Sequence, residues 1–214
     1  LGFDPDPSNI DVVSHRGPDG RGWQVFDTPA GPLALGHRRL AIIDVSDQGL
    51  QPMAYGPGLW TVFNGEIYNY LELRLELEQL GHRFRTHSDT EVLLASYAQW
   101  GEAALDRWLG MFALAIWDER KKTLFLARDR FGIKPLFVYA SGHGIAFASE
   151  IKQFLTLPGF PRRINPHRVW DFLSSGITDH HQETCFEGVE TLRNGRRLQS
   201  RLVHALQKGK PIVT

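Results

Sequence analysis

The sequence predicts an α+β fold in which β-sheets pack face to face. Strand-like segments, rich in aromatic, β-branched and other apolar residues, gather in two blocks at 33–63 and 111–148, and a helix-forming block lies between them. Short turns join successive strand-like segments, which favours antiparallel pairing. The chain has 214 residues, of which 42% are hydrophobic and 22% charged, so it can bury the core of one large domain or two small ones.

The first third of the chain combines turns with short strands. Residues 1–32 are rich in turns, and Pro18-Asp19-Gly20 is a clear one, because Pro fixes φ, Asp bonds to nearby backbone and Gly accepts positive φ. Strands are predicted at 33–35, 40–44 and 59–63. Judged locally, Asn64-Gly65 indicates a hairpin turn after the third strand, yet the residues after Gly65 resemble the start of a helix.

Two helices are predicted in the middle of the chain. In 69–80 four leucines alternate as in a strand, but a leading Asn, a body of Leu, Glu, Arg and Gln, and Gly81 at the end favour a helix. A second helix is predicted at 88–100, because Ser88-Asp89-Thr90-Glu91 fits a capping box and a glycine follows the last residue. A short helix is expected at 102–108.

The second block of strands is predicted to form an antiparallel meander, followed by a short helix at 149–155. Its strands are expected at 111–117, 123–127, 135–139 and 145–148. Within this block, Arg128-Asp129-Arg130-Phe131-Gly132-Ile133-Lys134 places alternating charges beside a glycine turn. We interpret this motif as a structural ion-pair network rather than as catalytic machinery.

Composition excludes several classes of function. Lys and Arg number 24, and Asp and Glu also number 24, which argues against a nucleic-acid binder. The single cysteine, Cys185, rules out an internal disulfide framework and fits a cytoplasmic location. No apolar run approaches the roughly 20 residues that span a membrane, and Leu1–Pro7 does not resemble a signal peptide. The nine histidines lack metal-ligand spacing and no GxxxxGK[ST] phosphate loop occurs, so we expect neither a metal nor a cofactor in this domain.

A few polar residues can be interpreted either as structural or as ligand-binding. Arg39, one of two adjacent arginines, is a surface charge or a bidentate partner of a carboxylate. Asp89 stabilises the first turn of its helix or pairs with an ammonium group. Asn64 and Gly65, if not a hairpin turn, offer the N–H donors of an oxyanion hole. These patterns alone predict an α+β domain with an anion-binding cleft.

Taken together and in order, these motifs resemble the glutaminase domain of glutamine-hydrolysing asparagine synthetase, a class II glutamine amidotransferase. The resemblance covers about residues 10 to 199, and the ordered set is far more specific than any single motif. The segments that carry it are Arg16-Gly17-Pro18-Asp19-Gly20, Gly36-His37-Arg38-Arg39-Leu40-Ala41-Ile42-Ile43-Asp44, Gln51-Pro52-Met53, Phe63-Asn64-Gly65-Glu66-Ile67-Tyr68-Asn69, His87-Ser88-Asp89-Thr90-Glu91, Gly110-Met111-Phe112-Ala113, Ala127–Leu136 and Phe147–Lys152.

The resemblance implies an N-terminal-nucleophile hydrolase fold, which is a four-layer α/β/β/α sandwich of two antiparallel sheets. It implies one amidotransferase domain at 1–199 and a divergent tail at 200–214. In the family an N-terminal Cys thiolate attacks the side-chain amide of glutamine, and the chain's own α-amine handles the proton. Ammonia then passes to a synthetase domain that uses ATP and Mg²⁺ to activate aspartate.

The resemblance also assigns roles to residues. Arg39 is expected to bind the α-carboxylate of glutamine and Asp89 its α-ammonium. Asn64, by its side chain, and Gly65, by its N–H, are expected to form the oxyanion hole. The remaining residues of the glutamine pocket are expected to be Glu66, Leu40, Ala41, Ile42 and Ile43. The expected partners are glutamine and a synthetase domain, with a homodimer left open and no nucleic acid or membrane.

The sequence departs from the family at both ends. The family opens with a Cys-Gly-Ile-type strand that is missing here, and Leu1 has no nucleophilic side chain, so we expect the chain as given to be nearly inactive. Cys185 is interpreted as an incidental thiol, and no Ser-Gly-Gly loop for ATP occurs. Three interpretations stay open. The first, which we favour, is a fragment of an active enzyme, and the second is a short protein that binds glutamine without hydrolysing it. A third is a class II amidotransferase that feeds ammonia to sugar phosphates or to phosphoribosyl pyrophosphate.

Overall fold

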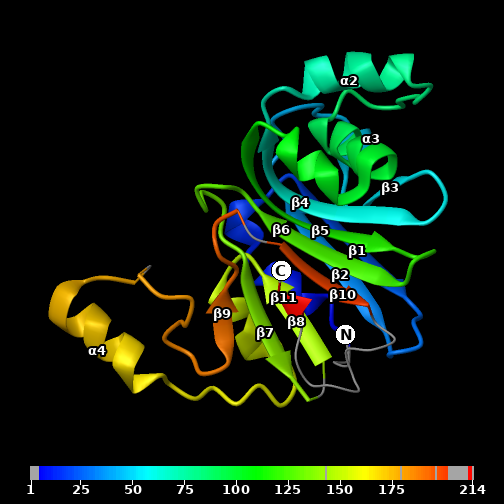
Figure 1. The fold of residues 1–214 in the computed structure, drawn as a ribbon. Coiled ribbons are helices and arrows are strands. Elements are labelled where there is room, and N and C mark those ends of the chain that lie inside the picture. The colour runs from blue at the N-terminus through cyan, green and yellow to red at the C-terminus, as the bar shows by residue number, and fades with distance from the viewer. Residues whose placement is uncertain (1–4, 143, 179, 196, 202–211, 214) are drawn as a thin grey trace.

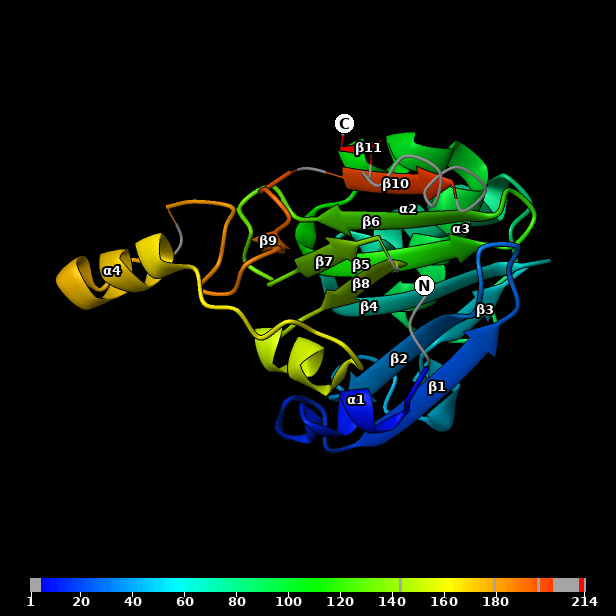
Figure 2. The same ribbon diagram turned by 90° about the horizontal axis from the view of Figure 1, so that it is seen from below.

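The computed structural model describes residues 5–142, 144–178, 180–195, 197–201 and 212–213. Four layers stack in the order α/β/β/α, as the two views show (Figures 1 and 2). The first of the two β layers is an antiparallel sheet of six strands in the order β11-β10-β6-β5-β4-β3. Its strands are β3 (Met53–Tyr55), β4 (Leu59–Ile67), β5 (Gly110–Asp118), β6 (Thr123–Arg128), β10 (Arg197–Arg201) and β11 (Ile212–Val213).

Two smaller antiparallel sheets make the second β layer. One pairs β1 (Gly20–Phe26) with β2 (Leu33–Arg39), and the other has the order β8-β7-β9. The strands of the latter are β7 (Phe137–Ser141), β8 (Gly144–Ala148) and β9 (Val189–Thr191). Both sheets pack on the same face of the six-stranded sheet, in a core that includes Leu35, Trp117, Leu126 and Phe147.

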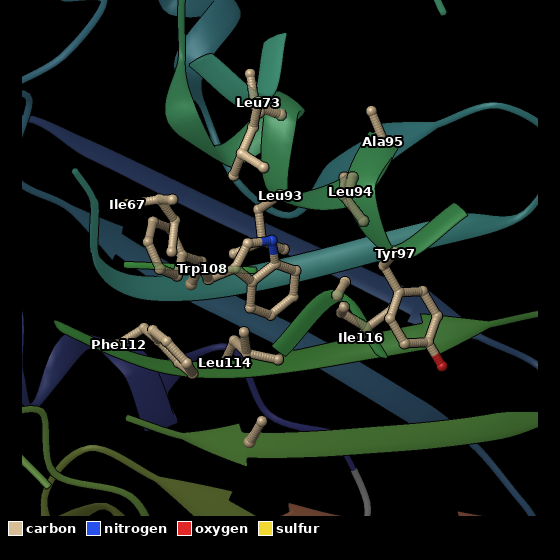
Figure 3. Packing of buried hydrophobic residues seen from close by; sticks show 14 of the residues in the cluster. Ile67, Leu73, Leu93, Leu94, Ala95, Tyr97, Trp108, Phe112, Leu114 and Ile116 are labelled. Carbon is tan, nitrogen blue, oxygen red and sulfur yellow. The ribbon is translucent and has the colours of Figure 1, made fainter. Parts of the chain in front are cut away.

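Helices cover the outer faces. The helices α2 (Tyr70–Gln79) and α3 (Asp89–Trp100) lie over the other face of the six-stranded sheet. Figure 3 shows their packing against it, with Leu93 and Tyr97 of α3 above Leu114 and Ile116 of β5. The outer layer on the opposite side is thin, with α1 (Ser8–Asp11) and 3₁₀ turns at Ser14–Arg16 and Ile151–Thr156; further 3₁₀ turns lie at Asp47–Gly49 and Gly101–Asp106.

One helix stands apart from these layers. α4 (Pro166–Ser175) projects away from the body of the molecule in both views (Figures 1 and 2). No described helix is long and apolar enough to cross a membrane. The predicted tail at 200–214 lies mostly outside the described residues, as do Leu1 and the predicted turn residue His143.

The two longer predicted helices are confirmed as α2 and α3, with one local correction, whereas the short helices predicted at 102–108 and 149–155 are 3₁₀ turns. In α2 the alternating leucines divide between the two sides of the helix, because Leu73 and Leu77 are buried while Leu71 and Leu75 are exposed. Ser88 caps α3 as predicted, since its side chain accepts from the Thr90 N–H. The reciprocal half of the capping box is wrong: the Glu91 carboxylate turns to the N–H groups of residues 85 and 86.

Three strand predictions need correction. Residues 40–44 form a loop, and its apolar Leu40 and Ile42 are exposed rather than packed into a sheet. The strand Gly20–Phe26 was not predicted, because its glycines are typical of turns. One of them, Gly22, leaves room for the Gln51 carbonyl. The predicted meander is divided, because β5 and β6 belong to the six-stranded sheet while β7 and β8 belong to another. The local hairpin interpretation of Asn64-Gly65 is also wrong, since both residues lie inside β4.

Candidate functional site

The site lies where the core between the two β layers changes from apolar to polar. Side chains on a strand alternate between its faces, so Leu33, Leu35, His37 and Arg39 of β2 share the face that points to the six-stranded sheet. The two leucines are fully buried in the core, whereas His37 and Arg39 line a cavity. In β4 the same change takes place from Val62 to Asn64 and Glu66.

This cavity has a volume of about 370 Å³. It brings together eight of the nine residues expected to form a glutamine pocket. Ala41 does not line it, and its N–H instead bonds to the Asp19 carboxylate at 2.9 Å. The expected residues on the wall are Arg39, Leu40, Ile42, Ile43, Asn64, Gly65, Glu66 and Asp89.

Arg39 is held rigidly by the loop that follows it. Its guanidinium donates through Nη1 to the Ser46 carbonyl at 2.6 Å and through Nη2 to the Asp44 carbonyl. Gly49 lies directly beside it, and a Cβ at this position would displace the guanidinium. A guanidinium has five N–H donors, so this buried cation keeps donors for an anionic ligand.

The same loop is attached to the start of α3. The Asp44 carboxylate accepts from the His87 N–H at 2.9 Å and from the Ser46 hydroxyl at 2.5 Å. Hydrogen bonds from Ser46 and His87 hold the pKa of Asp44 below its usual range. The loop therefore connects β2 to α3 across one side of the cavity.

Gly65 presents its backbone N–H to the cavity. Along one strand edge, the N–H groups of alternate residues point the same way. The Phe63 N–H bonds to the Gln51 side chain at 2.6 Å, and the Ile67 N–H bonds to the Asp89 carboxylate at 3.0 Å. The neighbouring strand β3 pairs only as far as Thr61, so the Gly65 N–H between them faces the cavity.

Close packing against β5 explains why position 65 is a glycine. Asn64 precedes it on the same strand. A Cβ on Gly65 would lie 2.1 Å from the Met111 carbonyl oxygen of β5, which no side chain allows. Asn64 lines the cavity, and its Nδ2 is buried without a hydrogen-bond partner. Burying a donor without a hydrogen-bond partner costs about 1–3 kcal/mol of folding free energy. Such a donor is typical of a functional site, where a ligand supplies the missing acceptor.

Asp89 supplies a buried negative charge at the N-terminus of α3. It is only 5% exposed, and the described ion pairs of the chain do not include it. Burial raises its pKa, and the nearby Glu66 adds to this effect, whereas the Ile67 and Thr90 N–H groups oppose it. A cation placed in the cavity would therefore find a carboxylate that lacks a positive partner.

His37 and Gln51 are among the lining residues that the sequence analysis did not assign to the pocket. Burial lowers the pKa of His37 to about 4, and the Arg39 charge adds to this effect, so its imidazole is neutral at physiological pH. Gln51 joins Phe63 of β4 to Thr90 of α3 and so fixes the distance between two walls. The two-residue period from Leu33 would have pointed to His37, but no local sequence signal marks Gln51.

The motif at 128–134 stabilises its own loop, but the predicted ion-pair network is wrong, because its charged groups bond to the backbone. The buried Asp129 carboxylate accepts N–H groups from residues 112, 131, 133 and 134 at 3.0–3.2 Å. Burial opposes its ionisation, but these four bonds together hold the pKa of Asp129 below its usual range. Arg128 donates to carbonyls of the same loop, so backbone hydrogen bonds rather than ion pairs dominate this network. Cys185 does not line the cavity.

Comparison with known proteins shows the family to which the chain belongs. Residues 7–208 match the family model for the glutamine amidotransferase domain. The chain is 39% identical over 192 residues to asparagine synthetase [glutamine-hydrolyzing] 3 of Bacillus subtilis, which covers 88% of the chain and 30% of that relative. It is 44% identical over 194 residues to a putative asparagine synthetase [glutamine-hydrolyzing] of Mycobacterium bovis, covering 86% of the chain and 29% of the relative.

A solved structure supports the fold class. The glutamine phosphoribosylpyrophosphate amidotransferase of B. subtilis superposes with a TM-score of 0.64 at 22% identity, over 94% of this chain and 48% of that one. The predicted α+β sandwich of the N-terminal-nucleophile hydrolase type is thus confirmed. The chain spans about 30% of the length of the curated relatives that it matches. On these grounds the chain belongs to the glutamine amidotransferase domain family.

Proposed function

We propose that the cavity binds glutamine and that the domain serves glutamine hydrolysis, with the ammonia used for ATP-dependent amidation of aspartate. One observation supports the proposal: the Arg39 guanidinium, the Asp89 carboxylate and two neutral N–H donors at positions 64 and 65 share one cavity of about 370 Å³. Glutamine carries an α-carboxylate, an α-ammonium and a side-chain amide. Arg39, Asp89 and the Asn64-Gly65 pair complement these three groups.

The donor pair suits acyl transfer. When a thiolate attacks the amide carbon, negative charge develops on the carbonyl oxygen, and N–H donors fixed in a buried site stabilise that charge. The C–N bond then breaks, ammonia leaves with a proton, and the acyl group remains as a thioester. Water hydrolyses the thioester to glutamate and frees the thiol. Asn64 Nδ2 and the Gly65 N–H are the donors that we assign to this oxygen.

The thiol must come from outside the described cavity wall, and the fold offers a place for it. β2 and β8 are not paired with each other in the described residues. Two cavities of about 120 and 130 Å³ lie between them, and Gly36, Phe147 and Ala148 line both. His37 and Asn64 line the second one as well as the glutamine cavity. A strand inserted between β2 and β8 would bring a thiol to the donor pair.

We further propose that the 214-residue chain binds glutamine without turning it over. Loss of the nucleophile costs about a millionfold in turnover in enzymes of this kind of chemistry. ATP and Mg²⁺ would act in a separate synthetase domain, which we place with this domain in the cytoplasm. Among the described residues, no group of three His, Cys, Asp or Glu side chains is placed to hold a metal ion.

Calorimetry and ammonia release test the proposal in two stages. Glutamine should bind the 214-residue chain, and Arg39→Ala should abolish the binding heat, whereas Arg120→Ala, at an exposed position, should not. A chain extended at its N-terminus by a Cys-Gly-Ile strand should release ammonia from glutamine. Absence of binding heat at millimolar glutamine would refute the pocket. Binding without ammonia release by the extended, folded chain would instead favour a glutamine sensor.

A further inference from the structure

His37 holds a hydrogen-bond acceptor at the wall of the glutamine cavity. A hydrogen bond to the Phe63 backbone opposes the lowering of its pKa by burial, so the imidazole donates to that backbone. The Phe63 N–H is already bonded to the Gln51 side chain at 2.6 Å, which leaves the Phe63 carbonyl as the acceptor. Nδ1 of His37 is buried without a hydrogen-bond partner among the described residues, so the bond comes from Nε2. In this neutral tautomer Nδ1 carries no proton and can only accept.

A buried donor without a partner lies beside this acceptor. Because the imidazole bonds to the backbone at residue 63, it lies next to Asn64 on β4. Asn64 Nδ2 also lacks a hydrogen-bond partner in the described part of the chain. Both residues line the glutamine cavity and the cavity of about 130 Å³ between β2 and β8. The wall therefore presents one acceptor and one donor that the described residues leave unsatisfied.

A primary carboxamide complements these two atoms. Its carbonyl oxygen accepts a hydrogen bond and its NH2 group donates, whereas a carboxylate only accepts. We infer that His37 selects glutamine over glutamate, because its Nδ1 accepts a hydrogen bond from the side-chain NH2 group of glutamine. The inference rests on the proposed function and adds a residue to it: Asn64 meets the amide oxygen of glutamine and His37 meets the amide nitrogen.

The same contact disfavours the product of the reaction. Hydrolysis replaces the NH2 group of glutamine by a second oxygen, which carries no proton at neutral pH. That oxygen would face the Nδ1 lone pair and leave a buried acceptor unpaired, which is how polar sites reject close analogues. His37 cannot supply the proton that departing ammonia needs, because its Nε2–H is bonded to the Phe63 carbonyl and its Nδ1 carries none. Its role is therefore to bind and to select rather than to transfer a proton.

Calorimetry with glutamine and with glutamate tests this inference on the 214-residue chain. One neutral hydrogen bond contributes roughly 2- to 10-fold in affinity, so His37→Ala should weaken the binding of glutamine by that factor. Glutamate should bind the variant at least as well as it binds the unmodified chain, so the preference for glutamine should fall by the same factor or more. His37→Asn, whose side-chain oxygen can accept a hydrogen bond, should recover part of the preference.

Two substitutions serve as controls. Asn64→Ala removes a donor that an oxygen of either ligand can use, so it should weaken both ligands and keep the preference. His167→Ala removes an exposed histidine that does not line the cavity, and it should change neither affinity.

Nitrogen NMR of the unmodified chain with ¹⁵N-labelled histidine needs no substitution, so its result does not depend on the folding of a variant. The His37 Nδ1 signal should be that of an unprotonated nitrogen. It should move upfield when glutamine binds, because the nitrogen then accepts a hydrogen bond, and it should not do so when glutamate binds.

Three results would overturn the inference. A folded His37→Ala chain with an unchanged preference shows that another group recognises the amide. A proton on Nδ1 in the ligand-free chain identifies the opposite tautomer, and an unmoved Nδ1 signal at saturating glutamine shows that the NH2 group lies elsewhere. The failure of the proposed function looks different: absent glutamine binding by the unmodified chain refutes the pocket itself, whereas binding with an unchanged preference refutes only the role of His37.

Discussion

Asp89→Asn separates the charge of the α3 carboxylate from its shape. The side chain keeps its size, and the new carbonyl oxygen can still accept the Ile67 N–H that Asp89 now accepts at 3.0 Å. What disappears is the negative charge that, in our proposal, meets the α-ammonium of glutamine. Binding and folding should therefore respond in opposite directions.

The expected loss of affinity follows from the strength of a charge-assisted hydrogen bond. Such bonds contribute about 1.5–3 kcal/mol, and each 1.4 kcal/mol is tenfold in affinity. The dissociation constant for glutamine should therefore rise by about 10- to 100-fold. Arg39→Lys, which keeps a charge but loses the planar fork, should weaken binding by a similar factor through the carboxylate.

Stability without ligand should change in the opposite sense. Because burial raises the pKa of Asp89, the native chain holds this proton more tightly than the unfolded chain. Its contribution to stability falls as pH rises from the unfolded value of 3.8 through the raised native pKa. Above that window the charged form is penalised only in the native state. Asparagine carries no charge, so the variant should unfold at equal or higher denaturant concentration at neutral pH.

Isothermal calorimetry and urea unfolding at neutral pH measure the two effects. Asp106→Asn is the matched control, since that carboxylate is 88% exposed. An Asp89→Asn variant that binds glutamine within about threefold of the unmodified chain would refute the assigned ion pair. Marked destabilisation of the variant would refute the electrostatic argument for a penalised charge.

Three further substitutions test the framework of the site. Gly65→Ala should destabilise the chain by about 1–3 kcal/mol in thermal unfolding, because its Cβ meets the Met111 carbonyl; unchanged stability would show that β4 and β5 can separate there. Asp129→Asn should cost about 2–5 kcal/mol, since one amide cannot accept four N–H groups. The same carboxylate has a lowered pKa, so its stabilisation should disappear in the unmodified chain as pH falls through that pKa. Gly49→Ala should displace Arg39 and weaken glutamine binding by roughly tenfold in calorimetry while leaving the fold intact.

Local chemistry in the sequence was sufficient for the helices. Ser88 and Gly101 mark the two ends of α3, and the structure uses both, the glycine with φ +60°. Strands that are buried on both faces, such as β5, were also recognisable as continuous apolar runs. In these elements the neighbours along the chain carry most of the information.

The loop after Arg39 could not be predicted in the same way. Leu40, Ile42 and Ile43 have the composition of a buried strand, yet they border a cavity and are partly open to solvent. The loop conformation depends on hydrogen bonds from the Arg39 guanidinium to its carbonyls and on the bond between Asp44 and His87. The Arg39 bonds span only 5 and 7 residues, but the bond between Asp44 and His87 spans 43, so no short window of the sequence contains all of these partners.

The apolar core and the candidate site are coupled because both take side chains from β2 and β4. Along each strand, the residues of both follow the same two-residue alternation of side chains. On β2 the residues that fill the core and Arg39, the proposed partner of the glutamine carboxylate, differ only by steps of two. On β4 the step from the core residue Val62 to Asn64, the proposed oxyanion donor, is also two residues. A shift of register by one residue would turn every one of these side chains to the opposite face. The apolar core therefore fixes the register that sets Arg39 and Asn64 in one cavity, and the site can keep an unpaired buried donor because the surrounding core stabilises the fold.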